Sequence, residues 1–119
     1  MKVLIADDEL RLRKVIALYM SKCGYEIIEA GNGETAIGLA KENKPDAIVL
    51  DVMMPGMTGI EATKKIRELP EFADTPIILL TANASEDDIK IGLASGANKY
   101  ITNPFSPKEL VESIDSLIK

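Results

Sequence analysis

Acidic and hydroxyl side chains directly follow three short apolar runs of the sequence. These side chains are Asp7 and Asp8 after residues 3–6, Asp51 after residues 47–50, and Thr81 after residues 77–80. If the runs are neighbouring parallel strands, their carboxyl ends share one edge of a sheet, and three carboxylates converge there. Carboxylates at such separations repel one another strongly unless a cation lies among them. Mg²⁺ suits this set, because it binds oxygen ligands and usually keeps positions for water and a substrate phosphate oxygen.

The strands that must position these residues can be read from alternating short apolar runs and amphipathic stretches. The runs are residues 3–6, 25–30, 47–50, 77–80 and 100–101. Four of them are nearly all apolar, as in parallel strands covered on both faces, whereas residues 25–30 carry two glutamates and suit an edge strand. The alternation predicts an α/β fold with a five-stranded parallel sheet, doubly wound into a three-layer sandwich. By analogy with known sheets of this kind, we expect the strand order 2-1-3-4-5.

The stretches between the runs have helical spacing and recognisable N-termini. Side chains that favour helix N-caps precede four of them: Asn32, Thr58, Ser85 and Ser106. Thr58 and Ser106 are each followed three residues later by glutamate, which is the capping-box pattern. In the first stretch, the residues with the spacing of one helix face are Leu12, Val15, Ile16 and Tyr19. In the last stretch they are Leu110, Val111, Ile114, Leu117 and Ile118.

Length and composition restrict the classes of function. The 119 residues form one ordinary domain, so we expect a single domain over residues 1–119. A net charge of −5 argues against direct binding to nucleic acid, and no apolar run approaches the length of a membrane span. One cysteine and no signal-peptide pattern fit a cytoplasmic protein. Because the chain has no histidine, Ser-His and Cys-His catalysis and His-ligated metal sites are excluded.

Four motifs at the ends of successive predicted strands resemble those of bacterial response regulator receiver domains, the CheY-like domains of two-component systems. The motifs are Asp7-Asp8, residues 51–59, Thr81-Ala82 and Pro104-Phe105. They match the receiver pattern in order and spacing, and the resemblance extends from about residue 2 to the C-terminus. It implies the flavodoxin-like doubly wound fold and a role in signal transduction by phosphoryl transfer.

The resemblance also implies roles for individual residues. Asp51 would be the phosphoacceptor, attacking the phosphorus of a phosphohistidine that a partner protein supplies. Mg²⁺ would be held by Asp7, Asp8, Asp51 and the backbone carbonyl of Met53. The chain would catalyse only its own phosphorylation and slow dephosphorylation, with Met53 and Asn83 flanking the path of the attacking water, and would not be an enzyme in the usual sense.

A switch and a set of partners follow from the same resemblance. The hydroxyl of Thr81 would turn toward the new phosphate, and Tyr100 would rotate inward in response. The phosphoryl donor would be a sensor histidine kinase or a histidine phosphotransfer protein. A downstream protein would bind the fourth helix, at about residues 85–95, together with strand 5 and the last helix. We expect no membrane or nucleic-acid partner, and either a monomer or a weak dimer.

The chain departs from the receiver pattern at Asn103, where receiver domains have a lysine. That lysine would contact the phosphate and the acceptor carboxylate, in a charge-assisted bond worth roughly 1.5–3 kcal/mol. Lys99 cannot be assumed to replace it, since an extended chain puts it ~13 Å away. We therefore expect phosphorylation without full switching. The Asn103-Pro104 peptide bond is also a candidate for the cis form.

Other interpretations of these residues stay open. With Asn103, the chain could be a pseudo-receiver, a protein-interaction module whose phosphate-dependent switching is impaired. A Mg²⁺-dependent phosphatase of the aspartyl-phosphate type is a third reading, but such enzymes carry a second acid where this chain has Met53. In purely structural terms, Asp7 and Asp8 could cap the first helix and Asp51 could be a loop residue. Thr81 could simply end its strand, and Tyr100 could be a half-buried sheet aromatic.

Overall fold

A computed structural model describes residues 1–81, 85–102 and 106–118, and five parallel strands form its centre. The strands are β1 (Lys2–Ala6), β2 (Glu26–Ala30), β3 (Ala47–Asp51), β4 (Ile77–Thr81) and β5 (Lys99–Thr102). The helices are α1 (Leu10–Lys22), α2 (Gly33–Asn43), α3 (Gly59–Arg67), α4 (Glu86–Ala94) and α5 (Pro107–Ile118), with a 3₁₀ turn, η1, at Pro70–Phe72.

The strand order is β2-β1-β3-β4-β5, and all neighbouring pairs are parallel, as predicted. The charged strand β2 lies at one edge, where Glu26 is exposed to solvent. The sheet reverses its direction of growth between β1 and β3, so the loops after these two strands leave the same carboxyl edge toward opposite faces of the sheet. Polar side chains that follow β1 and β3 are therefore brought together by the topology.

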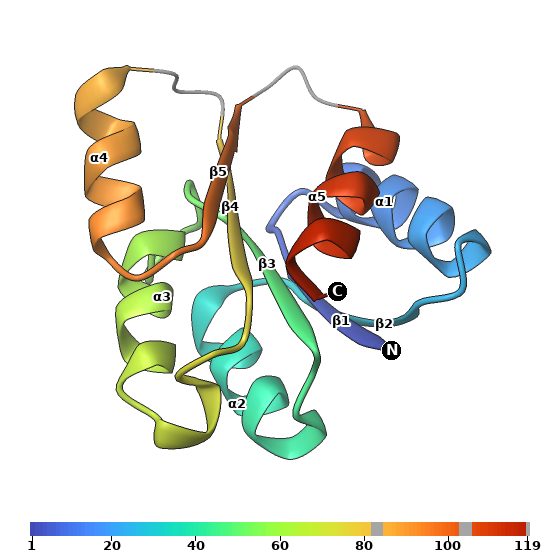
Figure 1. Cartoon of the computed structure of the whole chain (residues 1–119), viewed down its shortest axis with the longest axis horizontal. Helices are drawn as coiled ribbons and strands as arrows, with labels where there is room; N and C mark the ends of the chain where they lie inside the picture. Colours follow the sequence, from blue (N-terminus) through green and yellow to red (C-terminus); the bar gives the residue numbers. More distant parts are fainter. Residues whose placement is uncertain (82–84, 103–105, 119) are drawn as a thin grey trace.

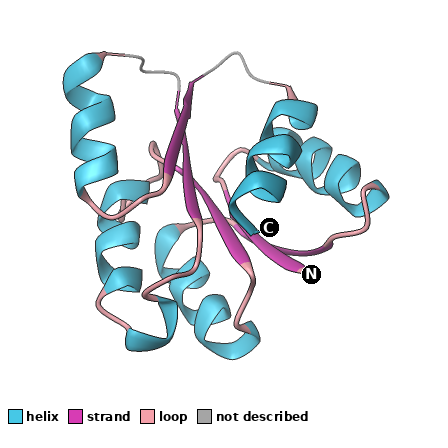
Figure 2. Cartoon of the chain, viewed as in Figure 1, coloured by secondary structure: helices cyan, strands magenta, loops and turns pink. Residues whose placement is uncertain are grey.

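Helices cover both faces of the sheet. Helices α1 and α5 pack on one face, and α2, α3 and α4 lie on the other (Figure 1; Figure 2). Alternate strand residues point to the two faces, so that Leu4 and Leu50 join the cluster under α2 and α3 while Ile5 and Val49 join the cluster under α1 and α5. Each fully buried aliphatic side chain of this kind contributes about 1.5–3 kcal/mol. None of the helices in the described ranges combines the length and apolarity needed to cross a membrane.

The four predicted N-caps are confirmed. Asn32 accepts a hydrogen bond from the Thr35 N–H at 2.8 Å, and the hydroxyls of Ser85 and Ser106 accept from backbone N–H groups three residues ahead. Thr58 forms the complete capping box, because the Glu61 N–H donates to its hydroxyl and the Thr58 N–H donates to the Glu61 carboxylate. The start of α3, directly after the β3 loop, is thereby fixed.

The predicted inner face of α1 is wrong at one residue. The side chain of Val15 is 57 % exposed, whereas Ile16, Ala17 and Met20 are buried against the sheet. The buried stripe is centred on the i, i+4 pair Ile16 and Met20, and the short Ala17 allows the helix to approach on that side. Spacing alone could not place the stripe, because Val15 and Ala17 flank Ile16 symmetrically. The stripe predicted for α5 is confirmed.

Gly59 is required where α3 passes the end of β3, because a Cβ there would lie 2.4 Å from the carbonyl oxygen of Asp51. We predict that Gly59→Ala lowers the free energy of unfolding by about 1–3 kcal/mol, since the obstructing atoms are backbone. Gly38→Ala is the matched control, because a Cβ at that exposed α2 position meets nothing within 4 Å. It should raise stability by about 0.5–1 kcal/mol. Urea denaturation measures both, and equal effects would contradict the close approach.

Candidate functional site

Three carboxylates meet at the carboxyl edge of the sheet. Asp7 follows β1, and Asp51 is the last residue of β3, the strand that pairs directly with β1. Asp7, Asp8 and Asp51 each place one carboxylate oxygen so that the three oxygens lie within 4.8 Å of one another. The convergence predicted from the sequence is thus confirmed, and the arrangement concentrates negative charge in a small volume.

Asp7 is the most constrained member of the cluster. Its side chain is 1 % exposed, and Oδ1 accepts a hydrogen bond from the Glu9 N–H at 2.9 Å. The other oxygen, Oδ2, is buried and has no hydrogen-bond partner among the residues that the structure describes. Helix capping does not explain this oxygen, because the N-cap of α1 is Glu9. A buried acceptor left unpaired costs about 1–3 kcal/mol, and more if it is charged, so Oδ2 calls for a cation or a proton.

Asp51 is half-buried beside Asp7. Its Oδ1 accepts a hydrogen bond from the Met53 N–H at 3.1 Å, which fixes the carboxylate at the start of the loop. Burial, followed by the negative charge of Asp7, raises the pKa of Asp51 from 3.8 to about 7, and Asp8 adds to the increase. The Met53 N–H opposes this effect without cancelling it. Near neutral pH, when no cation is present, Asp51 is therefore protonated in part of the molecules, which reduces the negative charge of the cluster.

The donor set fits a hard divalent cation. Only oxygens are offered, three carboxylates lie close together, and one buried oxygen is unpaired within the described part of the chain. Mg²⁺ and similar ions prefer such ligands, and their charge would reverse the upward pKa shift of Asp51. Asp8 is exposed and so can adjust to an ion, whereas Asp7 is already fixed. The backbone carbonyl of Met53 stays a predicted ligand.

Thr81 and Tyr100 lie on the neighbouring strands β4 and β5. Thr81 is the buried last residue of β4, one residue beyond Leu80, the register partner of Asp51. The half-buried Tyr100 packs against α4, where a Cβ on Gly92 would come within 2.7 Å of its ring. These positions agree with the predicted switch, but the roles of both residues stay predictions. Asn103, like Asn83 and the Asn103-Pro104 bond, lies outside the described residues.

Sequence reasoning missed two residues next to the cluster. Arg13 of α1 donates to the backbone carbonyl of Asp7 and forms an ion pair with Glu29 of β2. Glu29 had served only to mark β2 as an edge strand. The signal in the sequence was the position of Glu29, one residue before the end of a strand next to β1. Predicting its ion pair with Arg13 also requires the register of β1 and β2.

Comparison with known proteins identifies the family. The response regulator receiver domain family matches residues 3–115. The phosphate regulon transcriptional regulatory protein PhoB of Pseudomonas aeruginosa strain PAO1 is 43 % identical over 117 residues, which cover 98 % of this chain and 51 % of that protein. The transcriptional regulatory protein SrrA of Staphylococcus aureus strain NCTC 8325 is 43 % identical over 118 residues, covering 99 % of this chain and 48 % of SrrA. The chain spans about half the length of these curated relatives.

Solved structures agree. The chemotaxis protein CheY4 of Vibrio cholerae superposes with a TM-score of 0.93 at 34 % identity, covering 98 % of this chain and 97 % of CheY4. The receiver domain of the sensor histidine kinase PA1611 from P. aeruginosa PAO1 superposes with a TM-score of 0.90 at 32 % identity, covering 98 % of this chain and 96 % of that one. That structure holds a magnesium ion coordinated in its active-site cleft. The acidic cluster here is of the kind that binds magnesium in receiver domains.

The pKa of Asp51 gives a test of the cluster without metal. Because the folded pKa of about 7 lies above the ordinary value of 3.8, stability is lost as pH rises from about 4 to 7. We predict that Asp51→Asn, in a chelator, raises the free energy of unfolding by about 1–2 kcal/mol at pH 8 and by little at pH 4, after allowance for partial exposure. Glu42→Gln, an exposed acid in α2, should change it by less than about 0.5 kcal/mol at either pH. A pH-independent gain for Asp51→Asn would contradict the raised pKa of Asp51.

Proposed function

This chain belongs to the response regulator receiver domain family, and from that premise we propose that Asp51 accepts a phosphoryl group from a phosphohistidine of a partner protein. The observation that carries the proposal is the group of three carboxylates within 4.8 Å, which includes a buried unpaired oxygen of Asp7. When no ligand is bound, such a cluster lowers the stability of the fold. It becomes useful when a cation and a phosphoryl group share the site.

The proposed transfer is a displacement at phosphorus. A carboxylate oxygen of Asp51 forms the new P–O bond as the P–N bond to the donor histidine breaks, and the imidazole nitrogen leaves with the electron pair. The Met53 N–H, bonded to Oδ1, holds the Asp51 carboxylate in a fixed orientation for the attack. Bound Mg²⁺, with Asp7, Asp8, Asp51 and the Met53 carbonyl as ligands, would supply positive charge against the carboxylates and the phosphoryl oxygens. The product is a mixed anhydride, the aspartyl phosphate of Asp51.

Thr81 and Tyr100 carry the proposed response. The hydroxyl of Thr81, at the end of the strand beside β3, contacts the phosphate once Asp51 is modified. The ring of Tyr100 then changes its packing. Because the ring lies directly against Gly92, this change displaces α4 before the other elements. Of the α4 residues, all of which the structure describes, Gly92 alone is buried, so the helix can shift with little loss of core contacts.

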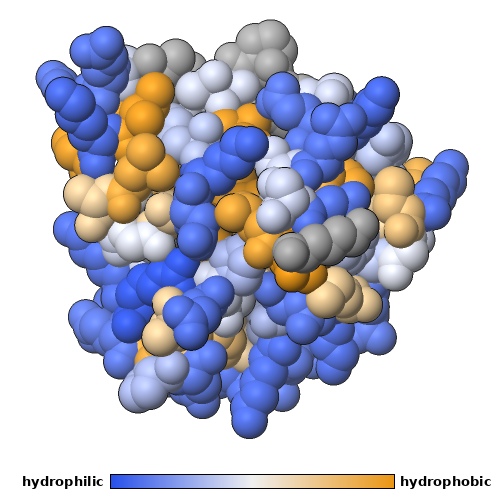
Figure 3. All heavy atoms as spheres, viewed as in Figure 1, coloured by the Kyte–Doolittle hydropathy of each residue, from blue (hydrophilic) through white to orange (hydrophobic). Residues whose placement is uncertain are grey.

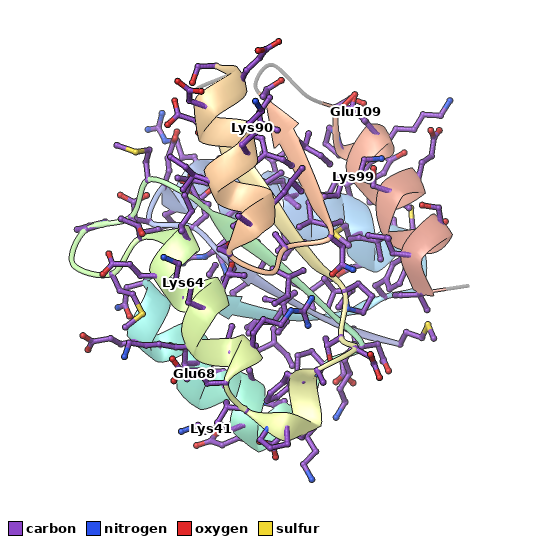
Figure 4. The ribbon with its side chains drawn as sticks, turned by 60° about the vertical axis from the view of Figure 1, so that its left-hand side comes forward. Lys41, Lys64, Glu68, Lys90, Lys99 and Glu109 are labelled. Carbon is purple, nitrogen blue, oxygen red and sulfur yellow. The ribbon has the colours of Figure 1, made fainter. Side chains whose placement is uncertain are left out.

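The proposed partner surface consists of α4, β5 and α5. Ile91 and Leu93 of α4 are exposed although they are large and apolar, and hydrophobic atoms reach the surface along this helix (Figure 3). Lys90, Lys99 and Glu109 come from the three elements in turn (Figure 4). Apolar side chains with a charged surround are typical of protein interaction sites. We propose that a downstream protein binds here.

The wider setting is part of the proposal. A sensor histidine kinase or a histidine phosphotransfer protein donates the phosphoryl group, and the chain acts in the cytoplasm as a monomer or weak dimer. It forms one domain over residues 1–119 and modifies only itself. Its net charge of −5 supports a protein partner over direct contact with nucleic acid.

Asn103 supports a second candidate, the pseudo-receiver. An uncharged amide in place of the family's lysine removes one charge-assisted contact to the phosphate, worth roughly 1.5–3 kcal/mol. The intact carboxylates favour phosphoryl transfer. The lack of the lysine ammonium weakens the coupling of the phosphate to Thr81 and Tyr100. The two candidates therefore differ in whether partner binding uses a phosphate on Asp51.

Phosphorylation of Asp51 can be measured directly. We predict that incubation with Mg²⁺ and acetyl phosphate adds one phosphoryl mass to the intact protein, because the carboxylates and the metal supply most of the stabilisation. The added mass should be absent in Asp51→Ala and in samples with chelator, and strongly reduced in Asp8→Ala. No added mass in the parent, together with addition in Asn103→Lys, would favour the pseudo-receiver.

The weakness of the switch can be measured with a phosphate mimic. We predict that beryllofluoride with Mg²⁺ shifts the amide NMR resonances of Val52 and Met53 in the parent and in Asn103→Lys alike. The resonances of Gly92 and Tyr100 should shift much less in the parent than in Asn103→Lys, because the parent lacks the cation that couples the phosphate to the sheet. Equal shifts at Gly92 and Tyr100 in the two proteins would show that Asn103 does not impair switching.

A further inference from the structure

We infer that Arg13 is a positioning residue for the acidic cluster, which it serves through the backbone carbonyl of Asp7. Its Nη1 donates to that carbonyl at 2.6 Å, and its Nε donates to Oε1 of Glu29 at 3.0 Å. The inference rests on the proposed function, because it concerns how the same carboxylates receive a divalent cation. Arg13 reaches no carboxylate of the cluster in these contacts, so it acts on the site through Asp7.

The guanidinium is well placed to hold rigid geometry. The side chain of Arg13 is 14 % exposed, and its two hydrogen bonds use different nitrogens of one planar fork. One bond joins α1 to Glu29 of β2, and the other joins α1 to Asp7, the residue that follows β1. Buried charge-assisted bonds of this type are shorter and stronger than neutral ones. Arg13 therefore ties three elements, α1, β1 and β2, together at the edge of the site.

The other polar group of the Asp7 backbone is held as well. The Asp7 N–H donates to the carbonyl of Ala30 at 3.1 Å, and Ala30 is the residue next to Glu29 in β2. Strand β2 thus holds Asp7 twice, directly through Ala30 and indirectly through Glu29 and Arg13. The peptide groups on both sides of the Asp7 Cα are fixed, which limits rotation of the backbone at this residue.

The fixed backbone of Asp7 also restricts the orientation of its side chain. Because its Oδ1 is bonded to the Glu9 N–H, the buried Oδ2 is presented to Asp8 and Asp51 in one orientation. Groups that orient metal ligands in this way typically change affinity by about 10–100-fold when removed. The positive charge of Arg13 is offset by Glu29, so its main effect is on geometry rather than on the local field.

Lys14 provides a matched control on the same helix. Its Nζ bonds the other oxygen of Glu29 at 2.9 Å, but the lysine is 62 % exposed and, within the described part of the chain, forms no hydrogen bond or ion pair with Asp7. Burial of Glu29 would raise its pKa, yet hydrogen bonds from Lys14 and Arg13 hold the pKa below its usual value. Both cations therefore bind the same carboxylate, and only Arg13 links it to the site.

The test is the Mg²⁺ dissociation constant of the full chain, measured by calorimetry at a temperature where circular dichroism finds every variant folded. Arg13→Met should weaken Mg²⁺ binding by about tenfold or more. Arg13→Lys should also weaken it, because one ammonium cannot replace the planar fork. Lys14→Met should stay within about twofold of the parent, and so should Ile16→Val, which destabilises the buried face of α1 without touching the site.

A second readout is independent of metal. The Asp8 N–H belongs to the same peptide group as the Asp7 carbonyl, so its ¹⁵N resonance in the metal-free protein should move in both Arg13 variants and stay in place in Lys14→Met. Mg²⁺ binding by Arg13→Met within about twofold of the parent overturns the inference. Mg²⁺ binding by Arg13→Lys that is as tight as in the parent overturns it as well. So does a loss of Mg²⁺ affinity in Ile16→Val equal to that in Arg13→Met. A parent that binds no Mg²⁺ overturns the metal site of the proposed function together with this inference, whereas normal binding in every variant overturns the inference alone.

Discussion

Repulsion among three carboxylates is the constraint on which the rest of the structure depends. Asp7, Asp8 and Asp51 bring oxygens within 4.8 Å at the edge of a sheet, and one oxygen of Asp7 is buried without a partner among the described residues. Burial, and after it the same repulsion, raises the pKa of Asp51 to about 7. We propose that the cluster is kept because of the cation and phosphoryl group that it binds, so that its cost to stability without a ligand is part of its function.

The fold tolerates the cluster because strong local structure surrounds it. The capping box at Thr58 starts α3 directly after the β3 loop, and Gly59 lets that helix pass the end of β3. On the other side, β2 and Arg13 fix the backbone of Asp7. Two apolar clusters, one on each face of the sheet, hold the strands themselves. The strained part is therefore confined to side chains at one edge, where the polar ends of strands are already exposed to solvent and ligand.

Local signals explain how much of this could be predicted from the sequence. Apolar runs, cap residues such as Asn32 and Thr58, and acids directly after strands are all read within a few residues, and they led to the helix starts and, once the strand order was taken by analogy with known sheets, to the convergence of Asp7, Asp8 and Asp51. The exposure of Val15 could not be predicted, because it depends on how α1 is rotated about its axis.

The link between Arg13 and Glu29 spans 16 residues and exists only once β1 and β2 are in register. The contact of Tyr100 with Gly92 likewise joins a strand to a helix that precedes it, and nothing in the local sequence signals it. The elevated pKa of Asp51 follows from burial and from its distance to Asp7, neither of which a sequence provides. What escaped prediction is therefore the set of contacts between elements, whereas each element and its chemistry were readable alone.

We propose that a divalent cation relieves the repulsion and leaves Asp51 ionised and ready to react. The most direct measurement is a ¹³C NMR titration of the Asp51 carboxyl carbon against pH, with and without saturating Mg²⁺. We expect a midpoint near 7 without metal, because of burial and the charge of Asp7, and a midpoint at least about one pH unit lower with Mg²⁺. A midpoint that is the same in both titrations would contradict it.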